Sequence, residues 1–528
     1  MSDSAPDAAP ARPWSRRTFV SRSVAAGAAI GAAGTLGAVG LLSRVGAAAD
    51  PEVAGTAAVL RGLAGTTGNS LPFAPELRPH HAVLRAAPGV RDLGRGVSAP
   101  LLLVNDALPS PLLRIRRGET FTARMENALS DPLILHWHGL TAPDDMDGHP
   151  RLAVAPGEVY DYAFEVNDRA GTYWYHSHTH HMTGRHTYLG IAGLLIVEDP
   201  DEEGPLGLPP RERELPIILQ DRRLGPDGVP VYEPMGPSMM NGFMGPEALA
   251  NGMLDAFTEV EPAVYRLRIL NGSNARIFRL GRSDGRPVVL IANDGGFLDR
   301  PHTLAHVDLA PAERVELLVD FRDAEEGDRI MLQSLPFEIP GGMMGGGMGG
   351  MGGMGGGMGG MMAEADHQGR PLELVEFRVS GSASDPGTLP STLPPMPELP
   401  DPAQSTRERR FDFSSRMMMH TVNGEMYEMD RIDVEVPFGD TETWTFVNDS
   451  TFPHPVHLHA THFRVLDRTG GRGEIYPWES GRKDTVLVLP GEQVRVAVRF
   501  TAERGLFLLH CHNLEHEDHG MMMNVRVV

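Results

Sequence analysis

The chain has 528 residues, of which 41% are hydrophobic and 22% are charged, and its formal net charge at pH 7 is -22. This length is more than one ordinary hydrophobic core needs, so we expect several domains. The strongly acidic balance argues against nucleic acid and against an anionic membrane surface as partners. The single cysteine excludes a disulfide within the chain, so cysteine usage does not identify the redox compartment.

The amino terminus carries the features of an export signal. Ser15-Arg16-Arg17-Thr18-Phe19-Val20 is a twin-arginine pattern, a Gly/Ala-rich apolar stretch follows over 24–42, and Ala47-Ala48-Ala49 comes next. We predict a twin-arginine signal peptide over 1–49, cleaved after Ala49, and a mature protein in the periplasm, the cell envelope or the extracellular space. The alternative is a retained anchor, since the apolar stretch has about the length needed to span a membrane. Its glycine and alanine content disfavours stable membrane insertion.

One turn-and-strand pattern occurs three times along the rest of the chain. Residues 50–100 carry few motifs and are expected to form a linker and an approach strand. Pro156-Gly157-Glu158, Pro311-Ala312-Glu313 and Pro490-Gly491-Glu492 then each precede an alternating segment that is typical of a half-buried strand. The two intervals between the prolines are nearly equal once a 22-residue Gly/Met tract, 341–362, is removed from the second. This spacing indicates three copies of one β unit.

The overall pattern predicts an all-β chain. Many short alternating segments separated by Gly, Pro and Asp turns favour β-sandwiches or barrels over βαβ units. We expect domains at 101–200, 201–400 and 401–528, with the Gly/Met-rich insertion 341–362 in the second of them.

The repeat also predicts where a shared site lies. His176 follows Pro156 by twenty residues, and His510 follows Pro490 by the same distance, so these two positions are equivalent. The equivalent residue of the middle copy is Met331, with no histidine near it in the sequence. We therefore expect the middle domain to be a spacer and the site to lie where the first and third domains meet.

Histidine clusters with metal-ligand spacing carry the chemistry. Side chains two residues apart share one face of a strand, so in a strand over 505–512 His510 and His512 point one way and Cys511 the other. Cys511, His516 and Met521, with one further histidine, form the ligand set of a blue copper centre. The alternative, a buried cysteine acting as a small hydrophobe beside accidental histidine pairs, is disfavoured because three more clusters supply partners. The four clusters are His136-Trp137-His138, His176-Ser177-His178, His454-Pro455-Val456-His457-Leu458-His459 and His510-Cys511-His512.

These clusters resemble the four copper motifs of the multicopper oxidases, the family that includes laccases, bilirubin oxidases, spore-coat laccases and bacterial cuprous oxidases. The resemblance covers nearly the whole mature chain and implies three cupredoxin-like Greek-key β-barrel or sandwich domains. It also implies four copper ions per chain, one of type 1, one of type 2 and a type 3 pair. The implied ligands are His454, Cys511, His516 and Met521 for type 1, His136 and His457 for type 2, and His138, His176, His178, His459, His510 and His512 for the type 3 pair.

The implied reaction couples one-electron oxidation of a donor at the type 1 copper to four-electron reduction of dioxygen to water. Electrons would pass from Cys511 through its neighbours to the type 3 pair. Water formation consumes protons, and Asp147 and Glu517 match the carboxylates that the family uses as proton relays, although most carboxylates are simply solvated. The remaining histidines are not expected to be ligands; those discussed below are His149, His180, His181, His186, His420, His462 and His519.

Methionines bear on the identity of the donor. Residues 341–362 consist of fourteen glycines and eight methionines, and thioethers are soft ligands suited to Cu(I). Such an insertion resembles those of bacterial cuprous oxidases. Two features depart from that pattern: Ser450 and Phe452 stand where those enzymes carry aspartate and methionine before the first type 1 histidine, and the tract lies inside the middle repeat. Shorter groups, which extend the copper path or fill gaps in the core, are Met235, Met239, Met240, Met244 and 417–419.

Three hypotheses for the function follow. The first is an exported, monomeric multicopper oxidase that oxidises Cu(I) and thereby detoxifies copper. The second keeps the cofactor and makes phenolic or bilirubin-like aromatic compounds the donors. The third, of another class, is a non-enzymatic copper-binding protein of cupredoxin fold, which the complete ligand set disfavours.

Overall fold

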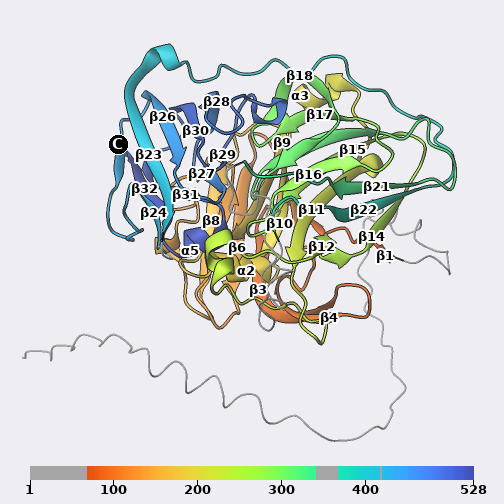
Figure 1. Ribbon diagram of the computed structural model, residues 1–528, viewed down its shortest axis with the longest axis horizontal. Helices are drawn as coiled ribbons and strands as arrows, with labels where there is room; N and C mark the ends of the chain where they lie inside the picture. Colours follow the sequence, from red (N-terminus) through yellow and green to blue (C-terminus); the bar gives the residue numbers. More distant parts are fainter. Residues whose placement is uncertain (1–67, 341–366, 417–418) are drawn as a thin grey trace, which may run out of the picture. The chain divides into compact units, whose positions relative to one another are not determined.

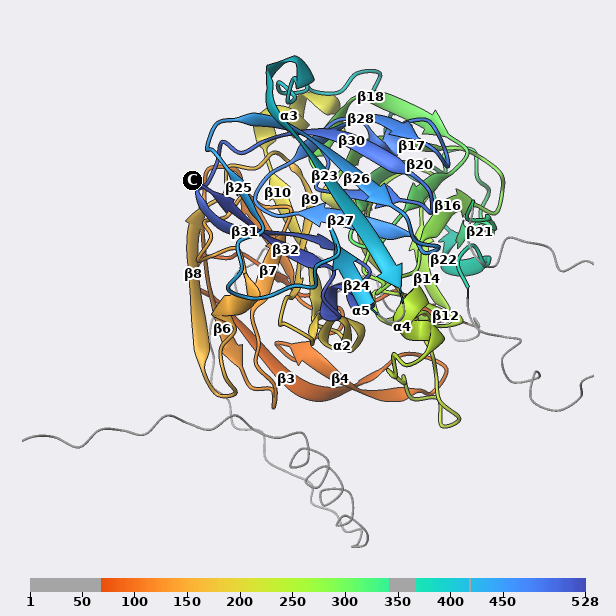
Figure 2. The same cartoon turned by 60° about the vertical axis from the view of Figure 1, so that its left-hand side comes forward.

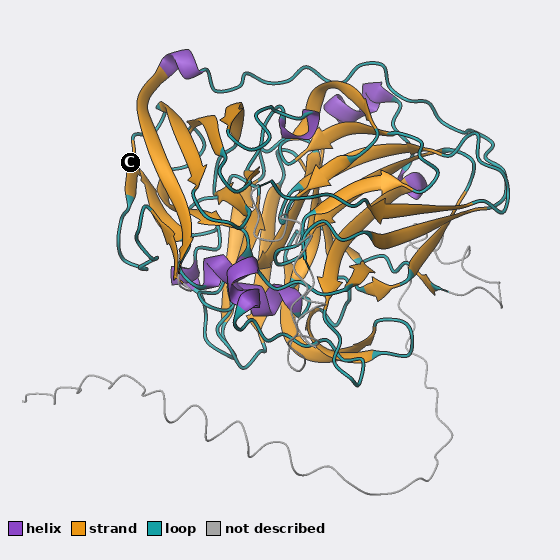
Figure 3. Cartoon of the chain, in the orientation of Figure 1, coloured by secondary structure: helices purple, strands orange, loops and turns teal. Residues whose placement is uncertain are grey.

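The computed structural model describes residues 68–340, 367–416 and 419–528, and strands dominate these ranges (Figures 1 and 3). The predicted signal peptide and the Gly/Met tract lie outside the described residues. None of the helices in the described ranges is long and apolar enough to cross a membrane. The helices are α2 (Thr183–Tyr188), α3 (Pro200–Glu203), α4 (Pro237–Asn241) and α5 (Leu514–Asp518), with short 3-10 turns η2 (Pro150–Leu152), η3 (Gly204–Leu206), η4 (Arg211–Arg213), η5 (Pro402–Gln404) and η6 (Pro477–Glu479).

The first pair of sheets comes from residues 76–198. Its strands are β2 (Glu76–Leu77), β3 (Ala82–Asp92), β4 (Ser98–Val104), β5 (Leu112–Arg116), β6 (Thr120–Asn127), β7 (Leu135–His138), β8 (Val159–Glu165), β9 (Gly171–Ser177) and β10 (Ala192–Glu198). One sheet has the order β4-β3-β6-β8 and the other β2-β5-β10-β9-β7. Phe121, Trp137 and Tyr175 belong to the hydrophobic core of this pair.

The second pair of sheets is the largest. Its strands are β1 (Asn69–Ser70), β11 (Glu214–Arg222), β12 (Glu247–Ala250), β13 (Met253–Leu254), β14 (Ala256–Val260), β15 (Val264–Asn271), β16 (Phe278–Arg282), β17 (Val288–Asn293), β18 (Gly296–Leu304), β19 (Val307–Leu309), β20 (Arg314–Asp320), β21 (Arg329–Ser334) and β22 (Leu372–Val379). The sheet orders are β13-β12-β11-β15-β20-β17-β18 and β1-β14-β22-β21-β16-β19. Leu267, Leu317 and Phe377 belong to its core.

The third pair of sheets follows η5. Its strands are β23 (Ser405–Arg416), β24 (Met419–Val422), β25 (Val434–Val436), β26 (Thr441–Asn448), β27 (His454–Leu458), β28 (Phe463–Thr469), β29 (Thr485–Val488), β30 (Gln493–Arg499), β31 (Gly505–Cys511) and β32 (Met522–Val527). The sheet orders are β24-β23-β26-β30-β28 and β25-β32-β31-β27-β29. Its core includes Trp444, Val456 and Phe507. We refer to the three pairs of sheets as the first, middle and third units.

The predicted repeat is preserved in three dimensions. Strands β8, β20 and β30 each begin directly after the repeated glutamate, and the three glutamates accept the same hydrogen bond from the backbone three residues earlier. The donors and distances are Ala155 N to Glu158 at 2.9 Å, Ala310 N to Glu313 at 2.7 Å and Leu489 N to Glu492 at 2.9 Å. This hydrogen bond closes the turn before each strand, so the same local contact occurs in all three units. The predominance of strands confirms the all-β prediction.

Part of the segment 50–100, which we expected to form a linker and an approach strand, lies in two strands of the first unit. These are β3 (Ala82–Asp92) and β4 (Ser98–Val104). Pro88-Gly89 interrupts the strand pattern, since proline lacks the N–H that a ladder needs. In the structure β3 pairs with β6 only over Ala82–Ala86, so Pro88 lies beyond that ladder and pairs with β4 alone. The domain limits at 101, 201 and 401 remain predictions.

Candidate metal centre

Strand register brings the histidine motifs together in opposing pairs. His136 of β7 lies opposite His176 of β9, and His457 of β27 lies opposite His510 of β31. Opposing residues of an antiparallel pair project from the same face. Each histidine two positions further along therefore joins the same face. Figure 2 shows β7, β9, β27 and β31, the strands that carry these motifs.

Eight imidazoles from the first and third units form one buried cluster. Across the two units, the rings of His136 and His459 stack with centroids 3.8 Å apart, and those of His138 and His457 stack at 3.7 Å. The other four members stand around them with centroid separations of 5.0–5.8 Å. The cluster thus lies where the first and third units meet, as predicted. Its members are His136, His138, His176, His178, His457, His459, His510 and His512, and none exposes more than 1% of its surface.

Each ring of the cluster turns one nitrogen toward the other rings. Within the part of the chain that the structure describes, His136 Nε2, His138 Nδ1, His176 Nε2 and His457 Nε2 are buried without a hydrogen-bond partner, as are both nitrogens of His512. His178, His459 and His510 direct Nε2 only at one another, at 3.1–3.4 Å. Buried nitrogens without partners are costly unless something binds them. Their convergence fits metal ions, for which neutral imidazole is a preferred ligand.

The opposite nitrogens are held by oxygen atoms. His136 Nδ1 donates to the Asp147 carbonyl at 2.6 Å, His459 Nδ1 to the Asp147 carboxylate at 2.6 Å, and His457 Nδ1 to the Asp484 carbonyl at 2.9 Å. Such bonds fix the tautomer and the orientation of a ligating ring. Burial lowers the pKa of His136, His457 and His459 well below the ordinary value. It lowers the pKa of His178 to about 4 and that of His512 to about 3, so these five rings are neutral near pH 7.

The two predicted proton-relay carboxylates both touch the cluster, in different electrostatic surroundings. Asp147 is fully buried, and burial raises its pKa well above the ordinary value, with a further contribution from Asp144. Glu517 Oε2 lies 3.1 Å from His510 Nδ1, and its Oε1 lies 3.7 Å from His178 Nδ1. Although burial opposes it, these imidazoles hold the pKa of Glu517 below the ordinary value. The pKa values of two carboxyl groups that contact one cluster are therefore displaced in opposite directions.

A second site lies behind the cluster, on the other face of β31. Cys511 Sγ is 3.4 Å from His454 Nδ1 and 3.7 Å from His516 Nδ1, and the two ring nitrogens are 3.2 Å apart. Met521 is fully buried in the same core as Cys511, and its backbone N–H donates to the His516 carbonyl at 2.9 Å. Burial raises the pKa of the Cys511 thiol above its ordinary value. A thiolate here requires a bound cation, which fits a soft metal ion.

The comparisons with known proteins agree with this geometry. Two sequence profiles described as multicopper oxidase match residues 89–202 and 392–528. Bilirubin oxidase of Albifimbria verrucaria is 32% identical over 446 residues, which cover 82% of this chain and 73% of that protein. Laccase of Bacillus subtilis is 30% identical over 482 residues, 79% of this chain and 88% of that protein. The crystal structure of the McoA multicopper oxidase of Aquifex aeolicus, 34% identical, has a TM-score of 0.77 and covers 88% of this chain and 100% of that one.

The chain belongs to the multicopper oxidase family. It is therefore an oxidoreductase, and the prediction of an enzyme is confirmed over that of a non-enzymatic binding protein. The predicted cofactor is confirmed as well: the family binds copper in the type 1, type 2 and type 3 pattern, and the histidine clusters are compatible with it. The cupredoxin-like fold class is shared with the structural neighbours.

In this multicopper oxidase the cysteine site is covered by α4 of the middle unit. His516 Nε2 donates to the carbonyl oxygen of Met240 at 2.9 Å, and α4 contacts α5, which carries His516. The short helices α2, α4 and α5 lie together in Figure 2. His454 Nε2 donates to Ser450 Oγ at 2.8 Å. Both rings are fully buried, so the edge of neither imidazole reaches solvent.

The middle unit is more than a spacer, which corrects the expectation from the sequence. Arg314, at the start of β20, pairs with Asp484 of the third unit through Nη1–Oδ1 at 2.8 Å and Nη2–Oδ2 at 2.6 Å. Asp484 Oδ1 in turn accepts from His138 Nε2 at 3.1 Å. The middle unit is thus connected to the histidine cluster through Arg314 and Asp484.

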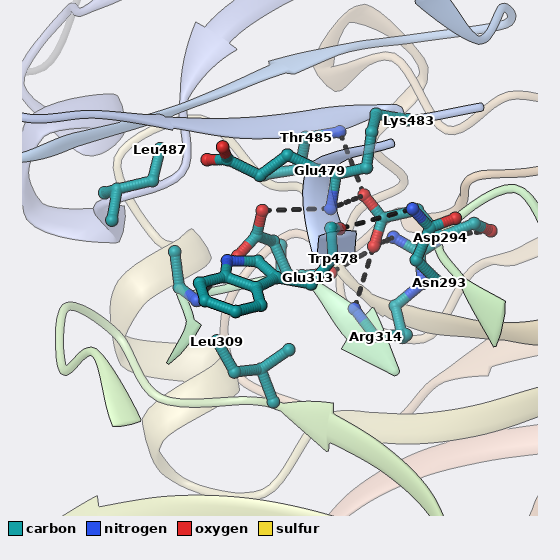
Figure 4. A network of polar contacts seen from close by, with 12 residues as sticks. Asn293, Asp294, Leu309, Glu313, Arg314, Trp478, Glu479, Lys483, Thr485 and Leu487 are labelled. Atoms are coloured by element: carbon teal, nitrogen blue, oxygen red, sulfur yellow. Dashed lines mark hydrogen bonds and ion pairs between the residues drawn. The ribbon is translucent and has the colours of Figure 1, made fainter. Parts of the chain in front are cut away.

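A further polar network includes Arg314 and Lys483, the residue before Asp484 (Figure 4). Lys483 Nζ bridges Asp294 Oδ2 at 2.8 Å and Glu313 Oε1 at 2.9 Å, and the Arg314 N–H donates to Asp294 Oδ1 at 2.9 Å. All four side chains are buried. The network fixes the segment that carries Asp484 to the middle unit.

Several side chains near the sites were not assigned a role from the sequence. His420 stacks on His516 with ring centroids 4.3 Å apart, and His462 Nε2 lies 3.8 Å from Asp484 Oδ2. His149 is buried and paired with Asn524 at 2.9 Å, and His186 lies 2.9 Å from Ser177 Oγ. The role of Asp484 could not be predicted from the sequence, because its partner Arg314 is 170 residues away in the chain. The other histidines near the motifs contact the backbone or one another: His180, His181 and His519.

Proposed function

We propose that this chain is an exported multicopper oxidase that oxidises Cu(I) to Cu(II) and reduces dioxygen to water, and so detoxifies copper. The observation that carries the choice of donor is the contact between His516 and α4. The imidazole of His516 is covered by the backbone of α4, which includes Met239 and Met240. Met235, just before α4 in the chain, is 71% exposed. Thioethers on the path to the site favour a soft monovalent cation over a bulky ring.

We assign the ligands from the clusters and the family motifs together. The proposed type 1 ligands are His454, Cys511, His516 and Met521, which share one side of β31. The type 2 ligands are His136 and His457. We divide the type 3 ligands of this cluster into two groups of three, His138, His176 and His512 in one and His178, His459 and His510 in the other.

Bound copper supplies the one-electron redox chemistry and the place where dioxygen is reduced. The polypeptide contributes the coupling between the two sites, because Cys511 is covalently continuous with His510 and His512 on the other face of the strand. Two further peptide groups assist: Asn513 N–H donates to Cys511 Sγ at 3.4 Å, and Cys511 N–H donates to the Met521 carbonyl at 3.0 Å. These bonds hold the cysteine rigidly between the sites.

Protons reach the cluster through the two buried carboxyl groups in this proposal. Asp147 contacts His136 and His459 on one side of the cluster, whereas Glu517 contacts His178 and His510 on another. Each carboxyl group therefore contacts two imidazoles of the cluster that would hold the copper ions. Substitution of either carboxyl group by its amide keeps the hydrogen-bond shape and removes the transferable proton.

The second candidate keeps the same cofactor and makes a phenol or a bilirubin-like aromatic the donor. The observation that favours it is Ser450, whose hydroxyl accepts from His454 Nε2 where cuprous oxidases carry a carboxylate. The relatives named laccase and bilirubin oxidase agree with this candidate. The burial of both imidazoles opposes it, since an aromatic donor needs close approach to a ring edge.

Oxygen uptake by the copper-loaded chain distinguishes the two donors. The decisive variant carries Met235→Leu, Met239→Leu and Met240→Leu, changes that conserve volume but remove the sulfur. We expect kcat/KM for Cu(I) to fall at least about tenfold and that for a methoxyphenol to stay the same. Met331→Leu, in β21 of the middle unit, is the matched control. Equal losses for both donors, or none for Cu(I), would reject the proposal.

The Gly/Met tract is tested by deletion of 341–362. If the tract captures copper, the deletion slows Cu(I) oxidation at low Cu(I) concentration and spares phenol oxidation. Unchanged Cu(I) kinetics would make the tract a linker. Export by the twin-arginine route is tested separately, by replacing Arg16 and Arg17 with lysine and following the protein in the cell envelope fraction.

A further inference from the structure

A cavity of about 360 Å³ lies beside the metal centre, between the first unit, the third unit and the segment that connects the middle and third units. Arg169 and Asp168 line it from the first unit, and His462 and Arg482 from the third. Residues 397–401 and Gln404 of the connecting segment line it as well. The volume is within the range of cavities that hold small molecules.

Two guanidinium groups in the wall have unused donors. Arg169 is 6% exposed; its Nε pairs with Glu202 at 2.9 Å and its Nη1 donates to the Phe297 carbonyl at 3.1 Å, while Nη2 is buried with no partner among the described residues. The half-buried side chain of Arg482 makes one hydrogen bond, from Nη2 to His462 Nδ1 at 3.3 Å, and forms no ion pair with a carboxylate of the described chain. A partly buried cation with open donors favours an anionic partner.

The carboxylates that line the cavity do not supply that partner. Asp168 accepts hydrogen bonds from the backbone N–H and the hydroxyl of Thr141, both at 3.0 Å. Asp401 accepts from Ala403 N–H at 2.9 Å, which caps η5. Glu398 is exposed at the surface of the connecting segment. The donors of Arg482 that make no hydrogen bond within the described chain therefore remain available for a molecule from outside the chain.

The cavity is also connected to the copper ligands. His462 lies between Arg482 and Asp484, with Nδ1 facing the arginine and Nε2 3.8 Å from Asp484 Oδ2. Asp484 accepts from His138 Nε2 at 3.1 Å. A molecule bound to Arg482 is thus separated from a proposed type 3 ligand by two side chains.

We propose that this cavity binds an anionic small molecule by its phosphate or carboxylate group, held by the guanidinium of Arg482, with the positive charge of Arg169 in the same wall. Arginine forks match the oxygen geometry of both groups. The remaining volume accommodates the body of the ligand against Pro397 and Pro400. The site is independent of the electron donor, so the inference stands or falls separately from Cu(I) oxidation.

Isothermal titration of the copper-loaded full-length protein tests the site, with inorganic phosphate in one arm and succinate in the other, at constant ionic strength. The variants are Arg482→Gln, which removes one fork, and Thr501→Glu, which adds a negative charge at the exposed rim. Arg495→Gln is the control, because Arg495 is exposed on β30 and pairs with Asp467 outside the cavity. The blue type 1 absorption band reports that each variant is folded and loaded.

We expect saturable binding of at least one anion to the wild type and the control, and at least about tenfold weaker binding to both cavity variants. Tighter binding of phosphate or of succinate identifies the preferred group. Absence of saturable binding to the wild type overturns the proposal. Equal affinity in the variants also overturns it, because the anion would then bind elsewhere, for example at copper. If Arg482→Gln fails to fold, Thr501→Glu decides alone.

Discussion

Arg314 and Asp484 form a fully buried, two-pronged ion pair that joins the middle unit to the third unit beside the copper ligands. The same guanidinium donates to the Thr172 carbonyl of the first unit at 3.0 Å and to the Asp294 carbonyl of its own unit at 3.0 Å. One side chain therefore contacts all three units. Although burial opposes it, Arg314 holds the pKa of Asp484 below its ordinary value, so the carboxylate stays ionised against His138.

Removal of this arginine tests the structural role of the middle unit. Arg314→Met leaves Asp484 charged and unpaired, which should cost about 3–5 kcal/mol of folding stability. We also expect loss of copper near His138 and His457, seen as a changed type 2 electron paramagnetic resonance signal. Arg322→Met is the control, since Arg322 pairs with Asp320 at the surface. Adding Asp484→Asn to Arg314→Met should recover stability; no recovery would contradict the pairing argument.

Substitution of the cysteine tests the ligand assignment. Cys511→Ser should abolish the blue absorption band and remove one copper ion per chain, while the cluster on the other face of β31 keeps its metal. Ser177→Ala is an informative control, because Ser177 occupies the equivalent position of the first unit, between two cluster histidines. Absorption spectra and copper analysis provide the readout. Persistence of the blue band in Cys511→Ser would refute the assignment.

The hydrogen bond between Ser450 and His454 allows the reduction potential of the proposed type 1 site to be tested by substitution. Ser450→Asp places a carboxylate against His454, as in the cuprous oxidase pattern. A charge at about 5 Å, with an effective dielectric constant of about 20, should lower the type 1 reduction potential by on the order of 100 mV. The neutral isostere Ser450→Asn should leave it nearly unchanged. Redox titration of the blue band measures both, and an equal shift in the two variants would show that charge is not the cause.

The contact between the first and middle units predicts a dependence of stability on pH. Glu316 is buried, pairs with Arg266 and Arg268 and accepts from Thr172 Oγ1 at 2.8 Å. Although burial opposes it, the arginines hold the pKa of Glu316 below its ordinary value of 4.5. A carboxyl whose pKa is lower in the folded state stabilises the fold above the unfolded value, and this stabilisation is lost as the pH falls through the folded value.

Glu316→Gln should therefore lower the melting temperature strongly at pH 7, by an amount equivalent to about 3–5 kcal/mol. The difference from the wild type should shrink once the pH falls below the ordinary carboxyl pKa. Glu326→Gln, at an exposed turn, is the control and should change little. Thermal unfolding at several pH values checks the prediction, and a difference that does not vary with pH would contradict it.

The sequence predicted the parts of this protein that are local or repeated. Alternation over 505–512 predicted β31 and the opposite faces of Cys511 and His510, and the repeated Pro-x-Glu turn predicted the starts of β8, β20 and β30. Both predictions agree with the structure because they depend on side chains that are only a few residues apart in the chain. The match of His176 with His510 also placed the cluster between the first and third units.

The remaining features depend on contacts between distant segments. Asp484 follows no motif, and its role appears only when Arg314 and His138 meet it in space. The cover over His516 is a backbone carbonyl of Met240, which a side-chain pattern does not reveal. Residues 50–100 carry few motifs and were expected to form a linker and an approach strand, whereas β3 pairs with both β4 and β6.

The measurement that tests the central claim most directly is oxygen uptake by the copper-loaded protein with Cu(I) as the only donor, set against uptake with a methoxyphenol. We predict one dioxygen consumed for every four Cu(I) oxidised, no hydrogen peroxide, and a higher kcat/KM for Cu(I) than for the phenol. Uptake with Cu(I) no faster than in the protein-free blank, together with rapid turnover of the phenol, would contradict the proposed function and leave the laccase-type alternative.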